Sequence, residues 1–416
     1  MVREKVEALE AKRGNGHGEG AFNESVADGV SLSTLWRAMG LHLTEKGLPL
    51  TNEFNAIRII SEHERWLGRI WWDTFHKKLF VLDVKTNCAR EWTDSDDLEV
   101  QVWLQGTIGL RKIGLETVRH SITAVGHRMA RDEPADHLRS IKWDGTDRID
   151  LWMTDKAGAV DSPYSRAVSR SFWCSLAARI LFPGHQVDTM VVFEGGQGIG
   201  KSSLLRVVGG AWYGEMHDSV TSREFPIALS GKALIEISEL SAFSKAETAR
   251  IKGVISCPVD RIRMPYDARA NDWPRRCIFA GTTNDDSYLK DPTGGRRFLP
   301  ITCGEIRLDL AAEDRDQCLA EAVVLVLQSN KWWEVPDAWS EQEAREQADP
   351  WLEIIEDTLL GKSTVTMGAL ILALEIPKER QHAGTAHRIG EIMRKLKWIR
   401  RRSNGKKFWE YRELCV

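Results

Sequence analysis

Residues Gly195 to Ser202 read Gly-Gly-Gln-Gly-Ile-Gly-Lys-Ser and fit the pattern G-x-x-x-x-G-K-[ST]. The apolar run at 189–194 predicts a short buried strand, and the run at 202–208 predicts a helix that ends at Gly209 and Gly210. A glycine-rich turn between a strand and a helix is where a phosphate-binding loop belongs. The alternative interpretation is an ordinary glycine turn that only joins the two elements.

Each residue type in this loop suits the binding of a nucleotide. Glycines let consecutive backbone N–H groups turn toward a phosphate, Lys201 can reach the β- and γ-phosphates, and the Ser202 hydroxyl can ligate Mg²⁺. We therefore expect ATP and Mg²⁺ as cofactors. The predicted ATP-binding residues are Gly195, Gly196, Gln197, Gly198, Ile199, Gly200, Lys201, Ser202 and Ser203.

Length, charge and cysteine content limit the class of protein. A chain of 416 residues predicts two or three domains. Because no apolar run approaches the roughly 20 residues of a membrane span and the N-terminus is charged, we expect a cytoplasmic protein without membrane contact. Seven cysteines without C-x-x-C spacing indicate neither a disulfide framework nor a zinc site. The net charge of −3 means that any surface for nucleic acid must be local.

The pattern along the chain predicts several segments. Residues 1–30 are charged and glycine-rich, which is typical of a flexible leader, and residues 31–155 mix helical and strand patterns in an N-terminal α+β domain. Residues 156–335 alternate apolar strands with helices, the pattern of an α/β sheet that carries a P-loop. A polar linker helix at 336–350 leads to a small domain at 351–416.

A P-loop ATPase also needs an acidic residue at the end of a neighbouring strand, where it holds Mg²⁺ and polarises the attacking water. The run 233–239 supplies two candidates. Glu239 follows the predicted strand 234–237 and is the preferred catalytic and metal-binding acid, together with Ser202 as a metal ligand. Glu236 lies within the strand, and its alternative interpretation is a partly exposed structural residue.

Two later positions complete the candidate catalytic set. Asn284 follows a predicted strand at 276–281, and a polar side chain there can position the lytic water. Arg296 and Arg297 lie on a glycine-rich turn, and one of them is a candidate arginine finger that reaches a γ-phosphate, in the same or a neighbouring subunit. The alternatives are a turn residue and a solvated basic turn.

The order of these motifs resembles the virulence-associated E family, whose ATPase domain is similar to superfamily 3 helicases of phages and mobile elements. The Walker A loop and the acidic strand are followed by 252–266, by Gly281-Thr-Thr-Asn284 and by Gly295-Arg-Arg-Phe298. The resemblance covers roughly Leu138 to Arg297 and includes Trp143-Asp-Gly145. Agreement of ordered motifs is more specific than any one of them.

The resemblance implies an AAA+-like, ring-forming and typically hexameric ATPase that moves along single-stranded DNA. By this resemblance Glu239 takes the Walker B role, Asn284 the sensor role, and Arg296 or Arg297 the finger role. The segment before Asn284 corresponds to the pore-facing region of the family, so four cations become candidate DNA contacts, with a solvated, salt-bridged face as the alternative. They are Lys252, Arg261, Arg263 and Arg269.

Two features depart from the family pattern. The acidic strand reads Glu-Ile-Ser-Glu instead of a simple Asp-Glu pair, which leaves the metal and base roles divided between two glutamates. The segment 31–155 has no zinc-ligand cluster and no paired acidic residues of the kind that polymerisation needs, whereas related proteins often carry a primase there. We therefore expect that priming requires a separate partner.

The C-terminal domain is locally basic. Its helical pattern at 384–397 has Ile389, Ile392, Met393 and Leu396 on one face, and residues 398–411 read as strand, Asn-Gly turn and strand. Helices followed by a basic hairpin predict a winged-helix-like domain that meets DNA phosphates, with a protein-docking module as the alternative. The candidate DNA contacts are Arg400, Arg401, Arg402, Lys406 and Lys407.

Together these patterns predict an α/β protein with an AAA+-like P-loop NTPase core, an α+β N-terminal domain and a winged-helix-like C-terminal domain. The hypothesis is an ATP-hydrolysing DNA helicase, a homo-hexamer acting on single-stranded or forked DNA in replication of a phage, plasmid or integrated element. The alternatives are a remodelling ATPase that is indifferent to DNA, and a replication-origin binding protein whose P-loop serves assembly.

Overall fold

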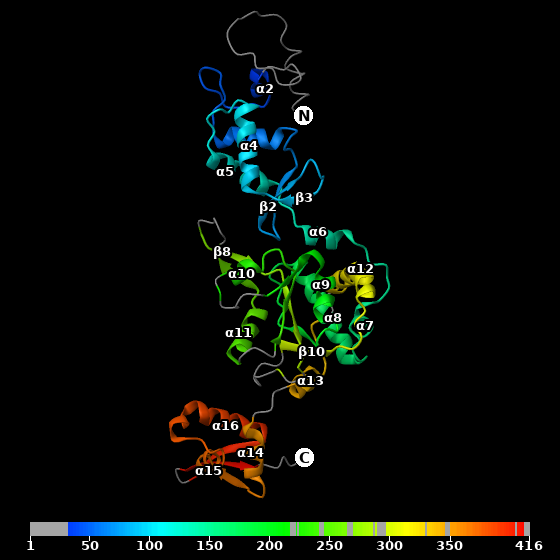
Figure 1. The fold of residues 1–416 in the computed structure, drawn as a ribbon, viewed down its shortest axis with the longest axis vertical. Coiled ribbons are helices and arrows are strands. Elements are labelled where there is room, and N and C mark those ends of the chain that lie inside the picture. Colours follow the sequence, from blue (N-terminus) through cyan, green and yellow to red (C-terminus); the bar gives the residue numbers. More distant parts are fainter. Residues whose placement is uncertain are drawn as a thin grey trace, which may run out of the picture.

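The computed structural model describes residues 32–216, 222, 224–240, 245–263, 269–285, 288, 297–328, 331–345, 350–403 and 406–411. The predicted leader at 1–30 lies outside them. In Figure 1 an N-terminal, a central and a C-terminal body follow one another along the long axis of the molecule. None of the helices in the described ranges is both long enough and apolar enough to span a membrane.

The N-terminal body combines helices with a small antiparallel sheet in the order β1-β2-β3. The two strands expected at 69–73 and 78–83 are present and pair with each other, Ile70 opposite Val81. Ile59, Leu104 and Ile122 are fully buried at the centre of its core, one from each of three helices. Its elements are α2 (Leu32–Ala38), α3 (Glu53–Glu62), β1 (Ile70–Asp73), β2 (Lys78–Leu82), β3 (Ala89–Glu91), α4 (Asp94–Gly106) and α5 (Leu115–Arg128).

A five-stranded sheet forms the centre of the molecule, and all four of its strand pairings are parallel. The three inner strands of the sheet are buried over their whole length, as expected for a parallel sheet covered on both faces. The strands predicted at 189–194, 234–237 and 276–281 all belong to it. In spatial order it consists of β10 (Phe298–Thr302), β4 (Met190–Glu194), β9 (Ile278–Thr283), β6 (Leu234–Ile237) and β5 (Tyr213–Glu215).

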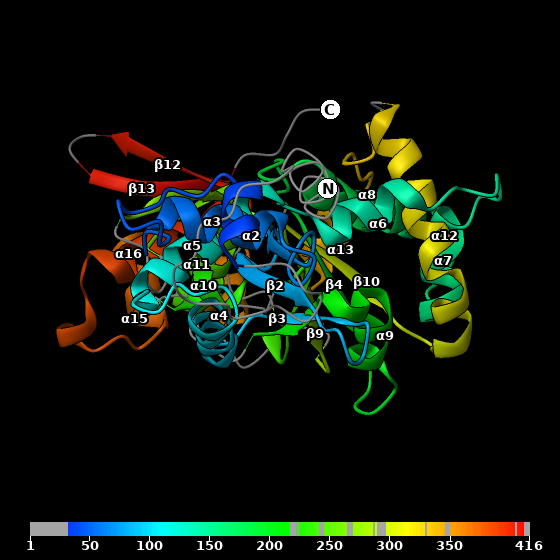
Figure 2. The ribbon, with the colours of Figure 1, turned by 90° about the horizontal axis from the view of Figure 1, so that it is seen from above.

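Helices cover both faces of this sheet, and alternate residues of β4 show the division. Val191 and Phe193 pack in the core that includes α7, α8, α9 and α12, whereas Met190 and Val192 pack with α10 and α11. Figures 1 and 2 show the two groups of helices on opposite sides. The bounds are α6 (Glu133–Ser140), α7 (Ile149–Ala157), α8 (Pro163–Leu181), α9 (Lys201–Gly209), η1 (Gly210–Trp212), α10 (Phe225–Ala228), α11 (Lys245–Ile255) and α12 (Leu308–Leu327).

The central body begins earlier than the predicted boundary at 155/156. Helices α6 and α7 contribute Leu138 and Trp152 to the same core as α8 and the sheet, and both side chains are almost fully buried. The backbone N–H groups of Arg148 and Ile149 donate to the Glu321 carboxylate of α12. The junction therefore lies near Asp132, because residues 133–157 bury their apolar faces in the central core.

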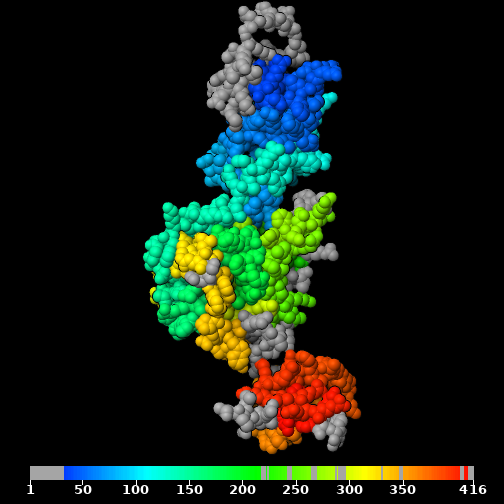
Figure 3. Space-filling view, turned by 180° about the vertical axis from the view of Figure 1, so that it is seen from behind, coloured from blue at the N-terminus to red at the C-terminus, as the bar shows by residue number. Residues whose placement is uncertain are grey.

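The turn between β1 and β2 docks the N-terminal body onto the central one. Gly231 donates its backbone N–H to the carbonyl of Phe75, and the Arg276 guanidinium forms two hydrogen bonds to Asp132, of 2.6 and 2.8 Å. The same guanidinium lies over the Phe75 ring. Figure 3 shows the N-terminal surface, in blue and cyan, meeting the central body at this narrow junction.

The predicted linker helix is part of the central body. In α13 (Ala338–Ala344) the Gln342 side chain donates to the carbonyl of Phe298, and Arg345, just after the helix, pairs with Glu194 at the end of β4. Two further strands, β7 (Val259–Ile262) and β8 (Asn271–Pro274), form an antiparallel hairpin on the same body.

The C-terminal body has a separate core in which Ile355, Leu370 and Ile389 are fully buried. Its sheet has the order β11-β13-β12, and the strands predicted at 398–411 form its antiparallel hairpin. The elements are α14 (Trp351–Leu359), β11 (Thr364–Thr366), α15 (Met367–Ala373), η4 (Lys378–Arg380), α16 (Ala383–Lys395), β12 (Trp398–Ser403) and β13 (Lys406–Tyr411).

Because its core is separate, a substitution in the core of the C-terminal body should destabilise that body and leave the central one undisturbed. Replacement of the fully buried Ile389 (Ile389→Ala) should destabilise it by about 2–5 kcal/mol. Leu372→Ala, at a side chain that is 79% exposed, should change its stability by no more than about 0.5 kcal/mol. Native-state hydrogen exchange resolved by peptide would measure both effects. Equal loss of protection in the strands of the central sheet would contradict the division into separate cores.

Candidate functional site

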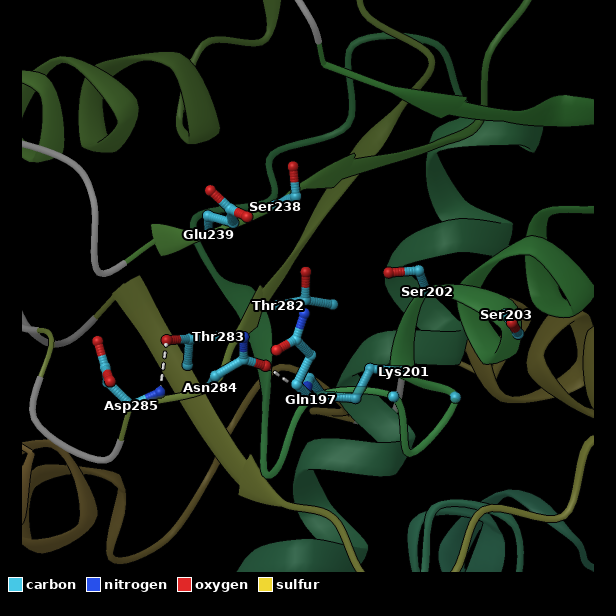
Figure 4. Close-up of a pocket in the computed structure, with 12 residues that line it drawn as sticks. Gln197, Lys201, Ser202, Ser203, Ser238, Glu239, Thr282, Thr283, Asn284 and Asp285 are labelled. Atoms are coloured by element: carbon cyan, nitrogen blue, oxygen red, sulfur yellow. Dashed lines mark hydrogen bonds between the residues drawn. The ribbon is translucent and has the colours of Figure 1, made fainter.

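The carboxyl ends of the central strands surround a cavity of about 460 Å³. Parallel strands end at one edge of a sheet, so β4, β6 and β9 deliver the residues that follow them to the same place. Figure 4 shows side chains from these strand ends and from α9 facing one another across it. The cavity is lined by Gln197, Gly198, Gly200, Lys201, Ser202, Ser203, Ser238, Glu239, Thr282, Thr283, Asn284 and Asp285.

The glycine-rich loop between β4 and α9 needs glycine at particular points. Gly195 has φ of 141°, and a Cβ there would lie 2.7 Å from Ile199 Cδ1. Gly198 and Gly200 also have positive φ, of 81° and 102°. Only glycine adopts such angles readily, so these residues let the backbone fold around the entrance to the cavity.

Lys201 begins α9 and turns its ammonium group back into the loop. Its Nζ donates to the carbonyls of Gly195 at 2.6 Å and Gly196 at 2.8 Å, and to Asn284 Oδ1 at 3.0 Å. Burial lowers the pKa of this lysine, and the nearby Glu236 carboxylate acts in the opposite direction. The structure therefore joins Lys201 and Asn284, which were predicted separately from positions 83 residues apart.

Glu236 points from β6 toward the first turn of α9 and is fully buried, so it is not the partly exposed residue of the alternative interpretation. Its Oε1 accepts hydrogen bonds from Ser202 Oγ at 2.7 Å and Thr282 Oγ1 at 2.8 Å. Its Oε2 accepts from the hydroxyl of Tyr213. A buried carboxylate needs such donors because its transfer from water is costly. Neither Thr282 nor Tyr213 is among the site residues predicted from the sequence.

Glu239 lies at the rim of the same cavity, beyond the end of β6. Its side chain is exposed, and its φ of 52° is unusual for a residue other than glycine. Strained backbone of this kind concentrates at functional sites. The two glutamates therefore differ in environment, because Glu236 is buried beside Ser202 while Glu239 faces the open cavity (Figure 4).

The side chains suit a magnesium–nucleotide complex better than a metal held by protein alone. Within the described ranges, no three His, Cys, Asp or Glu residues group closely enough to hold a metal. Mg²⁺ prefers oxygen ligands and usually takes one or two carboxylates or hydroxyls together with substrate phosphates and water. Ser202 Oγ and the Glu236 and Glu239 carboxylates supply ligands of that type beside the loop.

Of the two candidate finger arginines, the structure describes Arg297, which lies away from this cavity. Arg296 is outside the described residues. Arg297 immediately precedes β10, whose first residue lies beside the first residue of β4, and its Nε donates to Ser256 Oγ. Five strand residues at about 3.3 Å each separate this edge from the glycine loop by about 16 Å. Arg297 therefore does not line the cavity of its own chain.

The four candidate DNA contacts of the central body are divided. Arg261 and Arg263 lie on and just after β7, and Arg269 precedes β8; all three are exposed. Arg261 pairs with Asp272 across this hairpin. Lys252 of α11 is only 5% exposed and lies over the Phe298 ring. Lys252 is therefore buried, whereas the three arginines are exposed.

The C-terminal cations are divided by the alternation of strand β12. Arg400 and Arg402 lie on the face of the buried Trp398, and Lys407 is directly opposite Arg402 on the same face. Arg401 lies on the other face, where it pairs with Glu410 at 3.4 Å. Lys406 lies opposite Ser403 at the end of the hairpin. The run of three arginines therefore does not form a single surface.

The fold and the site define an α/β protein whose parallel sheet carries a glycine-rich loop at its carboxyl edge. The family model described as the virulence-associated protein E-like domain matches residues 138–350. The chain belongs to this family, which confirms the resemblance seen in the order of its motifs. The match begins at the residue where that resemblance was expected to begin.

Solved structures give a more distant likeness. The apo structure of the NrS-1 C-terminal region (305–718) has a TM-score of 0.49 and 13% identity, covering 82% of this chain and 95% of that one. An A-form apo structure of the same region has a TM-score of 0.46 and 14% identity, with the same coverage. No curated protein matches the chain significantly. Function does not follow from likenesses of this degree.

Neighbouring glycines of the loop should respond differently to substitution. Gly195→Ala combines positive φ with a close contact to Ile199 and should destabilise the loop by about 1–3 kcal/mol. Gly196→Ala is the matched control, because its φ is not positive and its nearest neighbour lies 3.8 Å from the added Cβ. Thermal unfolding of the two variants tests this, and equal stability of both would contradict the geometry described for the loop.

Proposed function

We propose that this chain is an ATP-dependent, ring-forming DNA helicase that acts in the cytoplasm in replication of a phage, plasmid or integrated element. The observation that carries the proposal is the convergence of the glycine loop, Lys201, Ser202, Glu236 and Asn284 at one edge of a parallel sheet. That arrangement supports a P-loop NTPase core of the AAA+-like type.

Each group at this edge suits a step in ATP hydrolysis. Backbone N–H groups of the loop and the start of α9 would bind the phosphates, with Lys201 exchanging its carbonyl partners for phosphate oxygens. Ser202 and Glu236 would hold Mg²⁺, which supplies charge neutralisation for the phosphates when it is bound. Glu239 faces the cavity and is suited to orient the attacking water, with Asn284 as its polar neighbour across the site.

A ring assembly would account for the position of Arg297. Arg297 lies at the amino edge of the sheet, about 16 Å from the loop by strand length, so it has no route to the phosphates of its own chain. In a ring, the surface of one subunit that carries Arg297 would complete the site of its neighbour. We propose a hexamer on this ground and by likeness to the family.

The C-terminal body supports the DNA-binding part of the proposal. The order α14, β11, α15, α16, β12, β13, with β11 paired to β13, is the order of a winged-helix domain. Arg400, Arg402 and Lys407 are exposed on one face of its hairpin and are placed to meet phosphates.

Steady-state ATP hydrolysis, with and without single-stranded DNA, tests the enzymatic proposal. Wild-type protein should hydrolyse ATP faster when DNA is present, and Lys201→Ala should lower the rate by on the order of 100-fold or more, because a charged donor to the phosphates is lost. Lys78→Ala is a control, since Lys78 is exposed and pairs with Glu91 in the N-terminal body.

The outcomes separate the proposed function from its rivals. Hydrolysis that is indifferent to DNA would favour a remodelling ATPase. Sequence-specific binding of duplex DNA with little turnover would favour an origin-binding protein. Unwinding of a forked duplex by the Lys201→Ala variant at the wild-type rate would contradict a helicase powered at this site.

The two faces of strand β12 should differ in their contribution to DNA binding. The double variant Arg400→Ala, Arg402→Ala should weaken DNA binding and reduce the slope of log K against log salt by about one to two, because each phosphate contact contributes about 0.7–0.9. Arg401→Ala should leave the slope unchanged, because this side chain lies on the opposite face beside Glu410. Salt titrations of binding measure both slopes. The same slope in all three proteins would favour a protein-docking role for the domain.

A further inference from the structure

Tyr213 is the first residue of β5, the strand at one edge of the central sheet, and its hydroxyl donates to Glu236 Oε2. Tyr213 is not among the residues that line the cavity, so its described contact with the candidate site is this hydrogen bond to Glu236.

The surroundings of Tyr213 fix the position of its ring. β5 pairs in parallel with β6, and Tyr213 lies beside Leu234, two residues before Glu236 and on the same face of the sheet. Gly209, at the end of α9, gives the ring room, because a Cβ at that position would lie 2.6 Å from Tyr213 Cβ. The Arg206 guanidinium lies 5.6 Å from the ring centre on the α9 side.

The donors to Glu236 are unequally divided between its two oxygens. Oε1 accepts hydrogen bonds from both Ser202 and Thr282. Among the described side chains, Oε2 accepts one hydrogen bond, from Tyr213. Glu236 is fully buried, so water does not readily replace a missing donor. Loss of the tyrosine hydroxyl would leave one carboxylate oxygen free to turn away from its present direction.

We propose that Tyr213 is a positioning residue for the metal–nucleotide site: it holds Glu236 in the orientation in which the carboxylate meets Ser202 and can support bound Mg²⁺. The inference rests on the proposed ATP site. It assigns to the edge strand β5 a part in metal binding that the glycine loop and the acidic strand alone do not supply. Partners that orient a metal-supporting side chain typically contribute 10- to 100-fold to metal affinity.

Tyr213→Phe tests the inference, because it removes the hydroxyl and keeps the ring contacts with Gly209 and Arg206. Binding of Mn²⁺ in the presence of adenylyl imidodiphosphate, followed by electron paramagnetic resonance, should weaken by about 10-fold. Binding of the same analogue in EDTA should change by less than about twofold. Tyr164→Phe is the matched control, since the Tyr164 hydroxyl is buried in the same body but donates to the carbonyl of Pro300.

A double-variant comparison separates positioning from general packing. If Tyr213 acts through Glu236, Tyr213→Phe should weaken Mn²⁺ binding in the wild-type background and have no further effect in a Glu236→Gln background. A loss of the same size in both backgrounds would overturn the inference, as would unchanged Mn²⁺ affinity in Tyr213→Phe. Wild-type protein that binds no Mn²⁺ with the analogue would instead overturn the proposed function together with this inference.

Discussion

The common direction of the five central strands is the constraint on which the candidate site depends. Because β4, β6 and β9 run in parallel, the residues after Glu194, Ile237 and Thr283 arrive at one edge although they are far apart in the sequence. The helix α9 begins at that edge as well, so its unpaired backbone N–H groups and its partial positive charge face the same cavity. Helices cover both faces of the sheet, so the hydrophobic cores on the two faces hold the strands that carry this polar edge.

The buried Glu236 carboxylate is the most demanding group in this arrangement. A buried carboxylate is tolerated only where hydrogen-bond donors surround it. Glu236 has three such donors, each from a different element: Ser202, Thr282 and Tyr213. Fully satisfied polar networks of this kind are rigid, and rigidity is what a preorganised catalytic site requires. The exposed and backbone-strained Glu239 lies outside this network and keeps its freedom to meet solvent or substrate.

Local patterns in the sequence predicted β4, β6 and β9 and the glycine loop, because each of these features depends on a few consecutive residues. What they did not predict depends on distant packing. Tyr213 reaches Glu236 because β5 lies beside β6, and no spacing in the sequence predicts that pairing. The early start of the central body was missed because α6 and α7 are short helices whose apolar residues find their partners in α8 and α12. The opposite direction of Arg401 follows from strand alternation and was available from the sequence, but the three consecutive arginines were interpreted as one patch.

The most direct measurement is an experimental structure of the protein with Mg²⁺ and adenylyl imidodiphosphate. We expect the triphosphate in the cavity at the carboxyl edge, within hydrogen-bond distance of the backbone N–H groups of residues 196–202, with Lys201 released from the carbonyls of Gly195 and Gly196 to contact phosphate. Glu236 should still accept from Tyr213. An analogue bound elsewhere, with Lys201 still donating to both carbonyls, would contradict the assignment of this edge as the nucleotide site.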